Sequence, residues 1–429
     1  MGGGLIQLVL KGKMDTYLTG NPEFSFFKAV YRRHTNFSIE SIRQQISNKG
    51  VGERVIKSKL SRAGDLIGKV TLEVKLDRGD ARNITSDGTY LNWVNNTGHA
   101  FIKECELIIG GQTIDKHTSK WLDIRNEVYD KYEQEWIGIN KHPGKYGYFK
   151  KGSKDIDSQQ LKLYIPLHFW FCDNPGLYLP IIGITKHEVE IHILTRSVEH
   201  LFNLDGELSF TNTEPDVNLW CEYIFLDNDE KRKFVLEKKA YLIEQVQVYE
   251  TKMQLINDIS LYHPVKQLFW VIQESVVNSE SGNGSSDTDA LLNISGYTQN
   301  NKNDYFNYQS INIGNKEIIY ATNSYESFKT CKLCLNGIDR FSERDASYFR
   351  LLQPLNSGLK IPTKHIYMYS FSLNPKDFQP SGSCNFSRLD KSQLVFTTGY
   401  NFINERLCVY AVNYNVLIVS AGMAGLVYK

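Results

Sequence analysis

Apolar and polar side chains alternate with a period of two along much of this chain, which is the pattern of β-strands that bury one face. Residues 69–76, for example, place four aliphatic side chains on one face and polar side chains on the other. Similar patterns predict further strands at residues 161–171, 185–194, 217–226, 242–249, 267–273 and 366–373. Each half of the chain contains about eight strand candidates separated by turn signals, and this predicts a β-sandwich or a jelly roll in each half.

Helical periodicity is scarce by comparison. Residues 121–132 are the only segment of the first half that convincingly predicts a short helix, and residues 343–352 are its counterpart in the second half. The polar, charged run at 227–233 marks the predicted boundary between the halves. The longest irregular region, 275–330, is rich in Asn, Ser and Gly, and we expect it to form surface loops.

The second half repeats the first in weak outline. Residues 105–111 (CELIIGG) are echoed by residues 331–337 (CKLCLNG), and in both an alternating apolar run reaches a Gly-Gly or Asn-Gly pair that suits a tight hairpin turn. Two further pairs occur in the same order, namely 65–70 with 264–269 and 174–180 with 374–380. Three matches in one order predict a duplicated domain of about 200 residues.

The C-terminal stretch could form either a transmembrane helix or a buried strand. Residues 407–428 contain no charged side chain over 22 positions, which is long enough to cross a bilayer as a helix. Asn413 and Asn415 lie within it, however, and Val, Ile and Tyr dominate its composition. We therefore interpret it as a buried strand followed by a Gly- and Ala-rich terminal segment, and we predict no transmembrane helix.

Composition and charge narrow the range of partners. Aromatic residues make up 12% of the chain, which favours strands. The net charge is +1, so the chain encodes no bulk attraction to nucleic acid or anionic membrane, and we expect no direct nucleic-acid partner. Seven cysteines, an odd number in a long chain, suit free thiols in a reducing compartment, and no secretory signal is recognised.

Two motifs suggest chemistry and fail on spacing. A phosphate-binding loop would need Gly and then Ser or Thr at the positions of Gln7 and Met14 around Gly12-Lys13. His187 and His192 resemble a zinc protease motif, but they stand five apart in an alternating segment and would point to opposite faces of a strand. We interpret both histidines as ordinary strand residues.

The remaining candidates are equally weak. Cys331 and Cys334 have the spacing of half a zinc site, but no second cysteine pair exists, so no metal is predicted. No catalytic arrangement stands out, and no cofactor is expected. Among several Asn-x-Ser/Thr sequences, Asn283 and Asn293 lie in the polar loop region and are the candidate glycosylation sites.

Several segments spread over the whole chain carry a more specific signal. The chain resembles the major capsid proteins of nucleocytoplasmic large DNA viruses. The resembling segments are DTYLTGNP (15–22), FFKAVYRRHTNF (26–37), GGQTIDK (110–116), NPGLYLP (174–180), QPSGSCNFSR (379–388) and NYNVL (413–417).

The resemblance implies an all-β fold of two tandem eight-stranded antiparallel jelly rolls with short helices in the loops. The implied division is an N-terminal arm at 1–24, a first jelly roll at 25–228 and a second at 229–429. The implied function is that of a non-enzymatic structural subunit whose homotrimeric, pseudo-hexagonal capsomers tile the icosahedral shell of a large DNA virus.

The same resemblance implies partners and a location. The partners are two further copies of the chain, neighbouring capsomers, minor capsid proteins and the inner membrane side, the last two through the N-terminal arm. The outer crown of the capsomer would include the loops at 275–330. The protein would be synthesised and assembled in the host cytoplasm and would reside in the virion capsid.

Two alternatives remain open from sequence. One is a minor or paralogous capsid protein of the same fold, which differs in copy number. The other is a tandem β-sandwich carbohydrate-binding protein, which would be monomeric or dimeric with acidic and aromatic residues in one groove.

Overall fold

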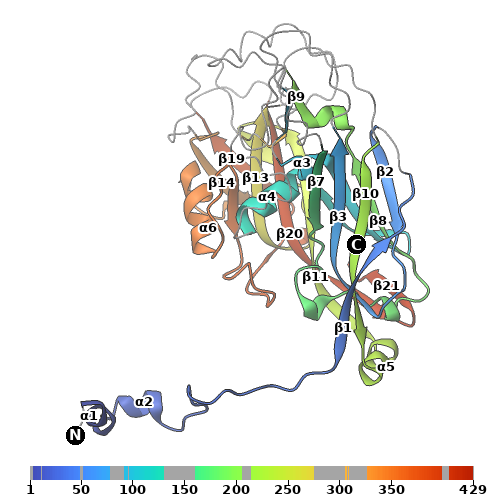
Figure 1. The fold of residues 1–429 in the computed structure, drawn as a ribbon. Coiled ribbons are helices and arrows are strands. Elements are labelled where there is room, and N and C mark those ends of the chain that lie inside the picture. Colours follow the sequence, from blue (N-terminus) through green and yellow to red (C-terminus); the bar gives the residue numbers. More distant parts are fainter. Residues whose placement is uncertain are drawn as a thin grey trace. The chain divides into compact units, whose positions relative to one another are not determined.

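The computed structural model describes residues 3–10, 12–48, 52–77, 91–94, 96–129, 160–204, 214–274, 305–306, 308, 326–398 and 405–428. The chain forms two compact units, Met1–Phe37 and Ser38–Lys429. The first unit contains two short helices, α1 (Gly3–Val9) and α2 (Asp15–Thr19), neither of which buries a residue. The second unit contains the sheets (Figure 1).

The first half of the chain supplies two four-stranded sheets. In spatial order, one consists of β1 (Phe37–Gln44), β10 (Asp216–Leu226), β3 (Leu66–Asp77) and β7 (Gln160–Leu167). The other consists of β2 (Arg54–Lys59), β8 (Val189–Thr195), β5 (Ile102–Ile109) and β6 (Gln112–Thr118). The strands β4 (Leu91–Trp93) and β9 (Phe202–Leu204) form a separate pair.

The second half supplies two larger sheets. One has the order β11 (Lys239–Lys252), β20 (Glu405–Ser420), β13 (Pro264–Glu274) and β17 (Tyr367–Ser370), with β18 (Cys384–Asn385) on β13 and β21 (Met423–Leu426) on β20. The other has the order β12 (Ile256–Asp258), β19 (Ser392–Thr397), β14 (Thr330–Leu335) and β15 (Ile338–Asp339), with β16 (Arg344–Asp345) on β14.

Strand order in the two halves is the same. If the eight main strands of each half are counted along the chain, one sheet contains the first, eighth, third and sixth, and the other contains the second, seventh, fourth and fifth. Successive strands thus pass between two facing antiparallel sheets, which is the jelly-roll arrangement. The fold is therefore a double jelly roll, as predicted, and the duplication inferred from sequence is a duplication of topology.

The sequence repeats occupy equivalent places in the two jelly rolls. Residues 105–111 run through β5 into the β5–β6 turn, and residues 331–337 run through β14 into the β14–β15 turn. Gly110 and Gly111 have φ of +58° and +78°, and Asn336 and Gly337 have φ of +49° and +79°. Both turns therefore use the left-handed backbone that the Gly-Gly and Asn-Gly pairs predict.

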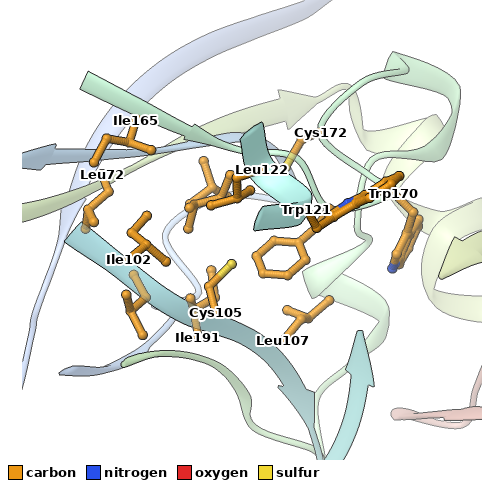
Figure 2. Close-up of a cluster of buried hydrophobic side chains, with 14 of the residues drawn as sticks. Leu72, Ile102, Cys105, Leu107, Trp121, Leu122, Ile165, Trp170, Cys172 and Ile191 are labelled. Atoms are coloured by element: carbon orange, nitrogen blue, oxygen red, sulfur yellow. The ribbon is translucent and has the colours of Figure 1, made fainter. Parts of the chain in front are cut away.

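Hydrophobic side chains form one core between the sheets of each half. In the first half, Figure 2 shows Leu72 and Ile165 from one sheet opposite Ile102 and Ile191 from the other. In the second half, alternate residues of β13 and β20 divide between two cores. Leu268, Trp270, Ile272, Leu407, Val409 and Ala411 pack in the second core, and Phe269, Val271, Cys408, Tyr410 and Val412 pack in the first. The sheet that contains β13 and β20 therefore lies between the cores, buried on both faces.

This double burial accounts for the uncharged C-terminal stretch. Residues 407–420 are part of β20, which pairs along its length with β11, and the chain then turns at Ala421 and Gly422 into β21. A central strand buried on both faces reads as a continuous apolar run because neither face requires polar side chains. The strand interpretation of this stretch is confirmed.

The predicted strands are confirmed with shifted ends. Segment 161–171 extends past the end of β7, because Phe169, Trp170 and Phe171 leave the sheet to pack in the core, and segment 185–194 starts ahead of β8. Most of the predicted surface-loop region 275–330 lies outside the described residues. Within it, Tyr305, Phe306, Tyr308 and Phe328 are buried in the cores and Thr330 begins β14, so the surface prediction is wrong for these residues.

The helix predictions are partly wrong. Segment 121–132 is confirmed as α4 (Ser119–Tyr129) over its described residues. Within 343–352, however, Arg344–Asp345 pairs with β14 as β16, and only Tyr348–Leu352 is helical, as a π-helix (η8) that continues into α6 (Gln353–Asn356). Residues 121–132 are also not the only helix of the first half. A buried helix, α3, spans Thr97–Phe101.

The charged boundary run enters a solvent-facing helix, α5 (Asn228–Leu236), whose first amide donates a hydrogen bond to the side chain of Asp227.

Gly110→Ala is expected to destabilise the protein by about 3 kcal/mol. A Cβ at position 110 would lie 2.6 Å from Nδ1 of His187, whose ring is held 2.9 Å from the Ala424 carbonyl of the C-terminal hairpin. The left-handed backbone adds a smaller cost of about 1 kcal/mol for any non-glycine residue. Urea unfolding measures the loss.

Gly111→Ala is the matched control, because Gly111 has the same sign of φ but no atom within 4 Å of the place that a Cβ would occupy. It should show only the backbone cost of about 1 kcal/mol. Equal losses in the two variants would contradict the proposed contact between residue 110 and His187.

Candidate functional site

The residues that the sequence suggested for chemistry do not come together. Asn283 and Asn293 lie outside the described residues. His192 lies in β8 and bonds Glu190 at 2.7 Å, whereas His187 precedes the strand and bonds Ala424. Cys331 and Cys334 are both buried in β14, where burial raises the pKa of each thiol and disfavours the thiolate that binds metal.

The described residues contain neither a cluster of metal ligands nor a membrane-spanning helix. Over those residues, no three His, Cys, Asp or Glu side chains are grouped so as to hold a metal ion. No helix in the same residues has the length and apolar character needed to span a membrane.

The two jelly rolls meet along a seam that is built on α4. Trp121 projects from this helix and packs between Phe269 of β13 and Tyr410 of β20, at ring-centroid distances of 5.7 and 5.8 Å. Tyr129, at one end of the same helix, donates a hydrogen bond to Gln267 of β13. Figure 1 shows α4 between the sheets of the two halves. A helix of the first half thus completes a core against a sheet of the second.

A buried carboxylate fixes the middle of the seam. Asp123 of α4 is fully buried, and its Oδ1 lies 2.5 Å from Nζ of Lys364 in the second half. Its Oδ2 accepts a hydrogen bond of 2.8 Å from the hydroxyl of Tyr308, and Asn96 donates to Oδ1. Burial raises the pKa of Asp123, and the charge of Lys364 opposes that rise.

Further polar contacts extend the seam on both sides of Asp123. Oε2 of Glu127 accepts a hydrogen bond of 3.0 Å from the Thr363 hydroxyl, and the Val128 carbonyl accepts one of 2.9 Å from the Lys360 amide. Near the C-terminal hairpin, the Lys186 amide donates to the Gly422 carbonyl at 2.8 Å. The halves are therefore joined by directional bonds as well as by apolar packing, which fixes their relative orientation.

A cavity of about 290 Å³ opens beside this seam, between elements of both halves. Its wall includes an ion pair from each half. Arg125 Nη2 lies 2.6 Å from Oδ2 of Asp173, and Lys266 pairs with Glu244. The buried Lys266 has a lowered pKa because burial disfavours its charge, an effect that Glu244 opposes. Burial acts to raise the pKa of Asp173, but the charge of Arg125 and a hydrogen bond from His168 outweigh it, so this pKa is lowered.

Sequence reasoning missed the seam. The segment that forms α4 was correctly predicted as a helix, but its periodicity does not reveal which side chains cross to the other half. The one available signal was Asp123, an acidic residue directly between the apolar residues Leu122 and Ile124 of that helix. All three are buried in the structure.

Two like-ordered jelly rolls fused along a buried seam define a double jelly-roll subunit. The family profile described as "Major capsid protein N-terminus" matches residues 25–227, and that described as "Large eukaryotic DNA virus major capsid protein" matches residues 230–425. The major capsid proteins of Pyramimonas orientalis virus and Paramecium bursaria Chlorella virus 1 are each 34% identical to this chain, with all of both chains covered. That of Phaeocystis pouchetii virus is 32% identical over the same full coverage.

Solved structures agree with the sequence comparisons. A structure of PBCV-1 VP54 matches with a TM-score of 0.74 and 28% identity, covering 94% of this chain and all of that one. The Faustovirus major capsid protein matches in fold, with a TM-score of 0.67 at 13% identity, covering 96% of this chain and 94% of that one. The chain belongs to the family of large eukaryotic DNA virus major capsid proteins, which confirms the resemblance found in the sequence.

Lys364→Met is expected to lower the free energy of unfolding by about 2–3 kcal/mol at neutral pH, because it leaves the Asp123 carboxylate buried without its charged partner. The variant should raise the pKa of Asp123 further. Over the interval between the ordinary pKa and this raised one, the unfolded chain has released the proton and the folded chain retains it, so stability falls as pH rises. The loss measured by urea unfolding should therefore be larger near pH 8 than near pH 5.

Lys332→Met provides the matched control, because Lys332 forms a 3.0 Å ion pair with Asp339, whose side chain is 46% exposed where that of Asp123 is fully buried. Its effect should stay within about 0.5 kcal/mol. Adding Asp123→Asn to Lys364→Met should recover part of the loss, since the uncompensated charge is gone. A double variant less stable than the single one would refute the charge argument.

Proposed function

We propose that this chain is the major structural subunit of an icosahedral capsid and that three copies form a pseudo-hexagonal capsomer. This proposal rests on the repeated strand order, which gives each subunit two similar barrels. Three subunits then provide six similar units around one axis, so a threefold object gains a nearly hexagonal outline. Such capsomers can pack edge to edge into a lattice through heterologous contacts.

The intramolecular seam supports this proposal physically. Capsomers tile a shell only if the spacing of the barrels is fixed, and the bonds around Asp123 and Trp121 fix it within each subunit. We further propose that the chain divides as an arm at 1–24 and barrels at 25–228 and 229–429. The family matches at 25–227 and 230–425 support that division, and the solvent-facing helix α5 begins at the boundary.

The second half also offers a surface for a neighbouring subunit. The helical segment η8–α6 follows its fifth main strand, as α4 follows that of the first half. Whereas α4 is mostly buried, this segment exposes Leu351, Leu352 and Leu355. In a ring of six similar barrels, the equivalent neighbour of the second barrel is the first barrel of the next chain. We propose that these leucines pack there.

The proposed surroundings follow from the family. The subunit would reside in the virion capsid after synthesis and assembly in the host cytoplasm, in contact with neighbouring capsomers and minor capsid proteins. Its role is structural, without catalysis, cofactor or direct nucleic-acid contact. Residues 275–330 would contribute to the outer crown, with Asn283 and Asn293 as the candidate glycan acceptors.

Light scattering of the purified protein should give a mass of about three times the 49.3 kDa chain. Leu355→Asp should shift the protein toward single subunits, because it places a charge in the proposed contact between chains. Leu236→Asp, which changes an exposed leucine of α5, should leave the trimer intact. A monomeric parent chain with affinity for glycans would favour the carbohydrate-binding alternative, and a low copy number in virions would favour a paralogous capsid protein.

The N-terminal unit should serve assembly and not folding. Leu8 and Val9 of α1 are 69% and 81% exposed, so the apolar side chains of this helix are available to a partner such as a minor capsid protein or the inner membrane side. Deleting residues 1–21 should leave soluble trimers but reduce the yield of closed shells, counted by electron microscopy. Leu5→Ser with Leu8→Ser should act similarly, and Gln7→Ser should not. Normal shells from the truncated chain would exclude this role.

A further inference from the structure

The cavity beside the seam has buried hydrogen-bonding groups that no atom of the described residues satisfies. Among its lining residues, Nη1 of Arg125, Nε1 of Trp170 and Nδ1 of His117 are buried and have no hydrogen-bond partner among the described residues. The Trp170 and His117 side chains are 5% and 2% exposed. A buried polar group without a partner is costly, which favours a bound partner for these atoms.

The acceptors of the cavity, by contrast, are already used. Asp173 is bonded by Arg125 and His168, Glu244 by Lys266, and Asp115 by Nε2 of His117 at 2.9 Å and by the Val246 amide at 3.2 Å. The unused atoms of Arg125 and Trp170 can only donate, while Nδ1 of His117 accepts or donates according to the protonation of the ring. The cavity therefore presents unmet donors and calls for a ligand that accepts.

The shape and the rim agree with a charged, compact ligand. A volume of about 290 Å³ holds a small anion together with some of its water. Lys376 and Phe378 line the cavity and are exposed, so the cavity is reached from the surface past a cation. Deeper in the wall lie Trp121 and Trp170, both labelled in Figure 2, and a low-dielectric wall of this kind strengthens bonds to a charged guest.

We propose that the seam cavity binds a small oxyanion, with Arg125 Nη1 and Trp170 Nε1 donating to its oxygens and Lys376 attracting it at the rim. Because the cavity wall combines β6, α4 and residues 168–173 of the first half with β11, β13 and residues 375–378 of the second, the bound anion would bridge the jelly rolls. A ligand that binds only the folded state raises the free energy of unfolding by mass action. The stability of the junction between the jelly rolls would therefore rise with the anion concentration.

The test uses the full-length, assembled protein with inorganic phosphate as the probe and chloride at equal ionic strength as the reference. Phosphate should raise the thermal unfolding temperature beyond chloride, and calorimetric titration should give a saturable affinity. Trp170→Phe keeps an aromatic side chain and removes one donor to a charged group, so it should weaken that affinity about tenfold. Lys376→Gln, on the surface, should weaken it less and chiefly at low ionic strength.

Trp270→Phe is the matched control. Nε1 of Trp270 is also buried without a partner among the described residues, but this side chain packs in the second core and does not line the cavity. Its phosphate affinity should equal that of the parent protein. The proposal is overturned if phosphate and chloride act alike, which would leave only ordered water in the cavity. It is equally overturned if Trp170→Phe binds phosphate as the parent does, or if Trp270→Phe weakens binding as much as Trp170→Phe.

Discussion

The rest of the structure depends on the burial of one sheet on both of its faces. The sheet of β11, β20, β13 and β17 covers the core of its own jelly roll with one face and receives α4 of the other jelly roll on the opposite face. Alternate side chains such as Phe269 and Trp270 therefore serve different cores. A jelly roll needs only its inner faces to be apolar, so the second apolar face exists for the partner barrel, and the two halves form one unit rather than two linked domains.

Polar groups fix the orientation of the two jelly rolls at this junction. Apolar packing alone tolerates sliding between surfaces, whereas the bonds from Lys364 and Tyr308 to Asp123 are satisfied in a single arrangement. Burying a carboxylate is costly, and the raised pKa of Asp123 reflects that cost. For a subunit that must repeat the same spacing many times in a shell, a fixed angle between the barrels is worth this loss of stability.

The fold was largely predictable from sequence, and the seam was not. Period-two alternation located the half-buried strands, and the two glycine-containing turns located equivalent hairpins, because both are local properties of the backbone. The buried helix at Thr97–Phe101 was missed, since it is too short for helical periodicity to register, and the helix predicted at 343–352 is confirmed only at Tyr348–Leu352. The bond between Asp123 and Lys364 joins residues far apart in the chain, and a single sequence carries no signal for such a pairing.

Duplication explains why the seam is asymmetric although its two components are alike. The segments after the sixth main strand of each half both contain Asn-Pro, and both contribute residues to the cavity wall. In the first half, Asn174 accepts a hydrogen bond from the Gly176 amide and closes a local turn, while neighbouring Asp173 holds Arg125. In the second half, the Pro375 carbonyl accepts a bond from the buried Lys266 at 2.9 Å. The equivalent turns of the two halves therefore contribute different groups to the cavity, a carboxylate in the first half and a backbone carbonyl in the second. The two turns have thus diverged in the group that each presents, which makes the seam asymmetric.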